Sequence, residues 1–110
     1  MGRKGNSKQM KFEWDEKKNL LNIRKHGISF EEAIYVFSDI DAISIFDEPH
    51  SDTEDRWVTI GKIITHGTVV VVHTERIRGE QEYIRIISAR KSEIIERIIY
   101  SFQNTATLRE

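Results

Sequence analysis

Residues 57–89, which contain most of the predicted sheet, read WVTIGKIITHGTVVVVHTERIRGEQEYIRIISA. This stretch contains three runs rich in β-branched residues, a composition that is typical of strands. The runs are 57–64, 68–74 and 83–89. The first two are joined through His66-Gly67 and the last two through residues 78–81. Because such short connections place neighbouring strands side by side, the sequence predicts a three-stranded antiparallel meander.

Two further strands and three helices are predicted on either side of this meander. The additional strands are residues 11–14 and 42–46. Between them, Asp15 is a candidate N-cap for a helix that ends at about Lys25 and is closed by Gly27. Ser29 with Glu32 fits the capping box of a second helix, in which apolar residues recur at helical spacing from Phe30 to Phe37. The final helix follows Ser92, a candidate cap, and carries an apolar stripe. The stripe consists of Ile94, Ile95, Ile98, Ile99 and Phe102. The order β-α-α-β-β-β-β-α predicts an α+β fold with a mainly antiparallel sheet of about five strands, two N-terminal helices and one C-terminal helix.

The chain has 110 residues, no cysteine and one proline. This length suits one domain, which we place at residues 10–110, and the polar residues 1–9 are predicted to be a disordered N-terminal extension. No apolar run approaches the roughly 18 residues that a membrane span requires. We therefore expect a cytoplasmic protein without a membrane partner and without disulfides or cysteine-based zinc sites.

The net charge of −1 hides a segregation of charge along the chain. Residues 1–30 carry eight basic and three acidic residues, residues 31–55 carry nine acidic residues and no basic one, and residues 56–110 carry nine basic and six acidic residues. Folding can bring the two basic segments together into one positive surface. The near-zero total therefore does not exclude a nucleic-acid partner.

The common cofactor and hydrolase motifs are missing. The sequence contains no P-loop, no G-x-G-x-x-G, no G-x-S-x-G and no H-E-x-x-H. The acidic loop 47–52 has carboxylates that are able to bind a hard cation, but it lacks the glycine and ligand spacing of a calcium loop. A solvated loop is the favoured interpretation, and we expect neither a cofactor nor a bound metal.

A cluster of charged residues near the ends of the last two strands is the candidate catalytic site. Its members are His73, Glu75, Arg76, Arg85 and Arg90. Metal-independent RNA cleavage needs a base for the 2′-hydroxyl, cations for the phosphorane and an acid for the leaving oxygen, and these residue types supply all three. Strand alternation puts His73 and Glu75 on one face and gives Arg85 and Arg90 opposite parity. Judged by residue types alone, a surface salt bridge of Glu75 with a neighbouring arginine is the favoured reading.

The first predicted helix offers a second candidate site. Lys18, Asn22 and Lys25 recur at helical spacing and are able to contact phosphates, and His26 follows them at the end of the helix. A solvated helix face explains the same pattern equally well.

Several separated motifs resemble the pattern of the BrnT toxin family. They are residues 14–18, Asn22, residues 25–27, Phe30, Ala33, Phe37, residues 54–57, Ile60-Gly61, residues 74–76, residues 85–90, Glu96 and Tyr100. The resemblance covers about residues 12–100. It implies a RelE-like ribonuclease toxin of a bacterial type II toxin-antitoxin pair, which arrests growth by cleaving RNA. The implied partner is a BrnA-like antitoxin of the ribbon-helix-helix type, through which the pair binds operator DNA and represses its own operon.

The resemblance changes the interpretation of the charged cluster from surface charge to active site. Within that site we place Arg76, Arg85 and Arg90 as phosphate and transition-state cations and Glu75 as the base. His26 or His73 is the candidate acid. The candidate substrate-binding residues are Lys18, Asn22, Lys25 and Arg56.

Two other functions remain open from the sequence alone. One is a non-catalytic RelE-like module that only binds nucleic acid or protein, and the other is a metal-dependent nuclease that uses the carboxylates of residues 47–55. The acidic segment 31–55 and the isoleucine stripe of the last helix are candidate contacts for the antitoxin.

Overall fold

The computed structural model describes residues 10–51 and 53–109 and has the predicted order of elements. The helices and strands are β1 (Lys11–Glu13), α1 (Glu16–His26), α2 (Phe30–Ala33), the 3-10 helix η2 (Ile34–Ser38), β2 (Ile43–Phe46), the 3-10 helix η3 (Glu48–His50), β3 (Arg56–Ile63), β4 (Gly67–Arg78), β5 (Gln81–Lys91) and α3 (Ile94–Arg109). The predicted α+β fold is confirmed. The prediction for residues 1–9 lies outside the described residues.

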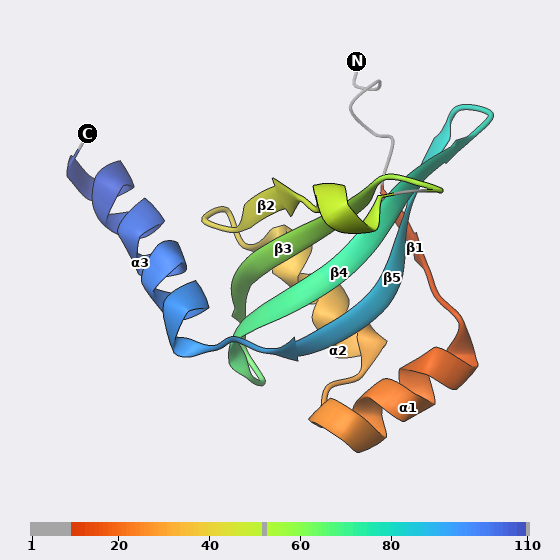
Figure 1. Cartoon of the computed structure of the whole chain (residues 1–110), viewed down its shortest axis with the longest axis horizontal. Coiled ribbons are helices and arrows are strands. Elements are labelled where there is room, and N and C mark those ends of the chain that lie inside the picture. The colour runs from red at the N-terminus through yellow and green to blue at the C-terminus, as the bar shows by residue number, and fades with distance from the viewer. Residues whose placement is uncertain (1–9, 52, 110) are drawn as a thin grey trace, which may run out of the picture.

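The sheet has five strands in the order β1-β5-β4-β3-β2 (Figure 1). The predicted meander of β3, β4 and β5 is confirmed, and β2 adds antiparallel to β3. Gly79 turns between β4 and β5 with φ of 63°, a left-handed conformation that favours glycine. The first strand behaves differently, because β1 pairs parallel with β5 and joins residues about 70 positions apart in the chain.

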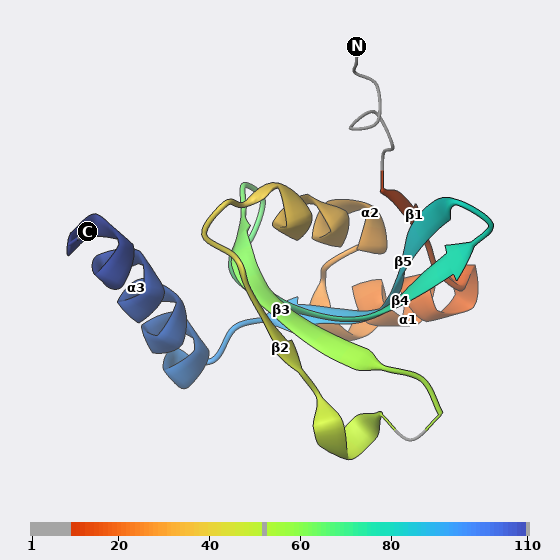
Figure 2. The same cartoon turned by 90° about the horizontal axis from the view of Figure 1, so that it is seen from above.

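One face of the sheet is covered by α2 and η2 (Figure 2). The capping box that begins α2 is confirmed: the Ser29 hydroxyl accepts a hydrogen bond from the Glu32 N–H, and the Glu32 carboxylate accepts one from the Ser29 N–H. The α-helical part is shorter than expected, because the chain tightens to 3-10 geometry at Ile34. The main core lies between these turns and the sheet. It consists of Ile28, Phe30, Ala33, Val36, Ile63, Val69, Val71, Ile84, Ile86 and Ala89.

Helix α1 lies along the edge of β5, beyond the short strand β1 (Figure 1). Its predicted caps are confirmed, since the Asp15 carboxylate accepts from the Lys17 N–H and Gly27 ends the helix at φ of 73°. The buried residues of α1 are two asparagines, Asn19 and Asn22, whereas its leucines are exposed. This helix therefore docks through amide hydrogen bonds more than through apolar packing.

A bulge in β5 changes the side of the sheet to which the side chains of its C-terminal half point. Val72 pairs with Ser88 but His73 pairs with Ile86, so Ile87 is an extra residue in the strand. The extra residue places Arg90 on the same side of the sheet as Arg85, although their numbers have opposite parity. The expectation that they point to opposite faces is therefore wrong.

Helix α3 projects away from the body of the sheet (Figure 1). Its residue Tyr100 is buried against Ile60 and Val70. The predicted cap is wrong: the Ser92 hydroxyl has no hydrogen-bond partner among the described residues, and the Glu96 carboxylate instead accepts from the Glu93 N–H. Within residues 10–51 and 53–109, no helix is long and apolar enough to cross a membrane.

Candidate active site

Arginines from three neighbouring strands share one face of the sheet. Arg56 of β3 pairs with Thr74 of β4, which in turn pairs with Arg85 of β5, and paired residues point to the same side. Arg76 is two residues beyond Thr74 and so lies on that side as well. The intervening residue positions of β4 face α2 and η2, where His73 contacts Phe37. We call the arginine-bearing side the open face.

Two carboxylates hold Arg76, Arg85 and the neighbouring Arg78 in place. Glu13 of β1 accepts hydrogen bonds from Arg78 at 2.9 and 3.0 Å and ion pairs with Arg85 at 3.5 Å and Arg76 at 3.7 Å. Glu54 accepts from Arg76 at 3.1 Å. The hydrogen bond from Arg78 lowers the pKa of Glu13, and that from Arg76 lowers the pKa of Glu54, so both carboxyls are ionised at neutral pH. The result is a set of three cations around two anions.

Arg56 completes the cluster with an unused donor. Its Nε is buried and has no hydrogen-bond partner among the described residues. A buried donor without an acceptor costs about 1–3 kcal/mol. Arg56 therefore adds a positive charge to the cluster while its buried Nε stays unpaired among the described residues.

Arg90 has a different environment from the other arginines. It donates to both carboxylate oxygens of Glu96 at 2.9 and 2.6 Å, and these hydrogen bonds raise the pKa of the guanidinium above its ordinary value. In the register it pairs with Val70, four residues from Thr74, which is roughly 13 Å along the strand. Arg90 thus anchors the start of α3 and lies away from the other arginines.

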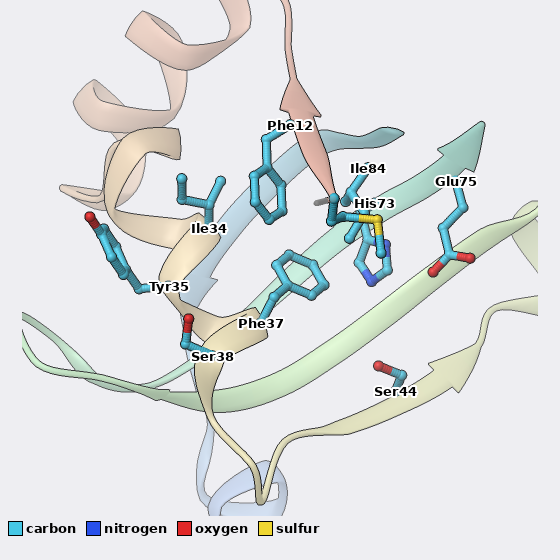
Figure 3. Close-up of a pocket in the computed structure, with 10 residues that line it drawn as sticks. Phe12, Ile34, Tyr35, Phe37, Ser38, Ser44, His73, Glu75 and Ile84 are labelled. Atoms are coloured by element: carbon cyan, nitrogen blue, oxygen red, sulfur yellow. The ribbon is translucent and has the colours of Figure 1, made fainter. Parts of the chain in front are cut away.

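Glu75 lies on the opposite face from the arginines. It lines a pocket of about 390 Å³ with residues of β1, η2 and the sheet (Figure 3). In the register Glu75 pairs with the core residue Ile84. The sheet separates the Glu75 carboxylate from Arg76 and Arg85, so the structure does not bring the predicted base and the predicted cations together in one site.

His73 is a core residue. It is buried, its ring packs edge-on against Phe37, and its Nε2 lies 2.7 Å from the Thr59 hydroxyl, which is 2.8 Å from the Ser44 hydroxyl. Burial lowers the pKa of His73 to about 4. The imidazole is therefore neutral at pH 7 and is not available as the predicted proton donor.

The family model for the ribonuclease toxin BrnT of type II toxin-antitoxin systems matches residues 14–96. The chain belongs to the BrnT family. No individual curated protein matches it. BrnT toxins are ribonucleases of type II toxin-antitoxin systems, so the chain is a toxin whose class acts on RNA and has an antitoxin partner. The matched segment contains every arginine of the open face.

The residues predicted to form a site on α1 of this BrnT chain differ in burial. Lys18 and Lys25 are exposed, and His26 is the last residue of α1. Asn22, between them, is buried and uses its amide on the main chain: Nδ2 donates to Ile28 and Ala89, and Oδ1 accepts from the Ala89 N–H. Because these contacts occupy its side chain, we do not carry Asn22 into the proposed RNA site.

Sequence reasoning missed Glu13, Glu54 and Arg78. Glu54 lies within a stretch, residues 54–57, that already resembles the BrnT pattern, so the family signal was available for it. Glu13 gave no signal, because its position beside Arg85 depends on the parallel pairing of β1 with β5. Among the described residues there is no group of three or more His, Asp or Glu side chains placed to hold a metal ion.

Proposed function

We propose that this BrnT toxin cleaves RNA on the open face without a metal ion and with its own arginines as the cations. The observation that carries the proposal is the convergence of Arg56, Arg76 and Arg85 from three adjacent strands onto one side of the sheet. A phosphodiester in transit to a phosphorane gains negative charge, and fixed guanidinium groups stabilise that charge.

The base must come from the same face, and Glu54 fits this role better than Glu75. Its side chain is 42% exposed and lies 3.1 Å from Arg76. When an RNA phosphate binds Arg76, it displaces Glu54 from that arginine. Glu54 then loses the hydrogen bond that lowers its pKa, so its affinity for a proton rises. Glu54 then removes the 2′-hydroxyl proton, the 2′-oxygen attacks phosphorus, and the 5′-oxygen leaves with a proton from water.

The helix lysines extend the binding surface. Lys18 and Lys25 are exposed on α1 and are able to contact phosphates beyond the cleaved one, and His26 lies at the end of the same helix. These contacts contribute to affinity and carry no role in the chemical step. Arg90 belongs to the anchor of α3 in this proposal.

The partner is proposed to be a BrnA-like antitoxin of the ribbon-helix-helix type. It neutralises the toxin, and the complex represses its own operon through the antitoxin's contacts with operator DNA. Support for a protein partner comes from the surface of α3, where five large apolar side chains are exposed. These are Ile94, Ile95, Ile98, Ile99 and Phe102.

The test compares substitutions on the two faces of the sheet, and its two glutamate variants are isosteric. Labelled RNA, free and ribosome-bound, is incubated in excess chelator with the wild type and with Arg85→Ala, Glu54→Gln and Glu75→Gln, each checked for native folding. We expect a loss of about 100-fold or more for the first two variants and less than threefold for Glu75→Gln. A metal requirement, or a larger loss for Glu75→Gln than for Glu54→Gln, would contradict the proposal.

A further inference from the structure

A second surface of the molecule has the opposite charge to the arginine cluster. A groove of about 1160 Å³ runs between the turns of α2 and η2, the end of β3 and the side of α3. Four carboxylate residues line it, and Lys62 is the one lysine or arginine among its lining residues. The carboxylates are Glu31, Glu32, Asp39 and Asp41. A concave site with this charge concentrates a negative potential and repels RNA.

The groove also presents apolar side chains to solvent. Ile64 on one wall is fully exposed, and Tyr35 on the other wall is 64% exposed. Ile40 does not line the groove but lies between its lining residues Asp39 and Asp41 in the chain, and it is 96% exposed. Large apolar groups that lie together in the open mark a surface for a partner, because exposing them to water is unfavourable.

We infer that this groove is the docking site for a basic, amphipathic segment of the antitoxin, an inference that rests on the proposed function. Charge complementarity selects the occupant, because lysine or arginine side chains satisfy the carboxylates while apolar residues of the same segment cover Ile64 and Tyr35. The volume exceeds the range of about 300–1,000 Å³ of small-molecule sites, which favours a length of polypeptide. The antitoxin then binds the toxin at a distance from its positive surface.

Some carboxylates in the groove stabilise the fold, and others are available to contact a partner. Burial raises the pKa of Asp39, but hydrogen bonds from the Tyr100 hydroxyl and the Lys62 N–H outweigh this effect and the net shift is downward. Glu32 is part of the capping box. Glu31 and Asp41 support the fold less, since Glu31 is exposed and accepts one hydrogen bond, from Asn19. These two are the positions at which to test binding without removing Asp39.

The experiment reverses charge inside and outside the groove by the same amount. The double variant Glu31→Lys and Asp41→Lys is compared with Glu48→Lys and Glu82→Lys, whose sites are exposed and do not line the groove. The apolar pair is Ile64→Asn, inside the groove, and Ile77→Asn, an exposed residue at the end of β4. Calorimetry measures the affinity of each for a purified BrnA-like antitoxin, the proposed partner, with melting curves and RNA cleavage as controls of folding.

We expect both groove variants to bind the antitoxin at least tenfold more weakly than their controls, while RNA cleavage and melting temperature stay near the wild type. Equal affinity across all variants overturns the inference that the antitoxin docks in the groove and leaves the proposed function in place. A wild-type chain that cleaves RNA but binds no antitoxin overturns the proposed partner and the groove together. If light scattering shows that the toxin alone dimerises and the groove variants are monomeric, the occupant is a second copy and the inference is wrong.

Discussion

Asn22 makes with Ala89 the two hydrogen bonds that a neighbouring strand would make. Its Nδ2 donates to the Ala89 carbonyl at 2.8 Å, and its Oδ1 accepts from the Ala89 N–H at 3.1 Å. Strand β1 pairs with β5 only as far as Arg85, so the edge beyond it depends on this side chain. Asn22 thus extends the sheet by one amide and attaches α1 to it.

The first prediction concerns this amide. Asn22→Ala leaves the Ala89 N–H and carbonyl and the Ile28 carbonyl without their partner, so we expect the free energy of unfolding to fall by about 3 kcal/mol. Urea denaturation measures the change, and Lys18→Ala on the exposed side of the helix is the control. A loss no larger than that of the control would show that water replaces the amide.

The second prediction concerns Glu13, which occupies the arginines that an RNA phosphate would use. Glu13→Gln keeps the shape of the side chain but removes its negative charge. We therefore expect several-fold tighter binding of an oligonucleotide without 2′-hydroxyls, which the proposed reaction does not cleave. Fluorescence anisotropy at two salt concentrations measures the affinity. Glu80→Gln at the hairpin tip supplies the same change of net charge, and equal gains from both variants would argue against a specific role for Glu13.

The third prediction separates Arg90 from Arg85. Arg90→Ala breaks the two hydrogen bonds to Glu96 at the start of α3, so we expect stability to fall by about 1–2 kcal/mol. The kcat for RNA cleavage should change less than threefold, whereas Arg85→Ala should lower it by about 100-fold or more. A large loss of kcat in a well-folded Arg90→Ala variant would return Arg90 to the active site.

The fourth prediction is a pH dependence of stability that arises from His73. Its pKa is about 4 in the folded protein against 6.5 for an ordinary histidine, so protonation favours the unfolded chain. The unfolding free energy should fall by about 3 kcal/mol as the pH drops from 6.5 to 4. Chemical denaturation across this range measures it, and His73→Leu should remove most of the slope while His50→Gln, at an exposed site, should keep it.

The helices were predictable because their signals are local. Asp15 and Gly27 bound α1, and Ser29 with Glu32 begins α2, as the capping patterns indicate. The meander was predictable for the same reason, since its turns join neighbours in the chain. Each of these features depends on residues within a few positions of one another.

The candidate site was predicted less well because it depends on register. A single extra residue, Ile87, reverses the facing of Arg90, and residue spacing alone gives no sign of such a bulge. The pairing of β1 with β5 brings Glu13 to Arg85 across most of the chain. The residue types of the cluster were recognisable, whereas their distribution over the two faces followed from the three-dimensional structure.

The parallel pairing of the first strand with the last also determines when the arginine cluster is able to form during translation. A ribosome that makes this chain produces Glu13 early, but Arg85 and the strand edge that receives β1 appear only when β5 has been translated. A nascent or prematurely ended chain that lacks β5 therefore has no assembled arginine cluster. Under the proposed function, only chains whose translation has passed β5 are therefore able to cleave RNA in the cell that makes them.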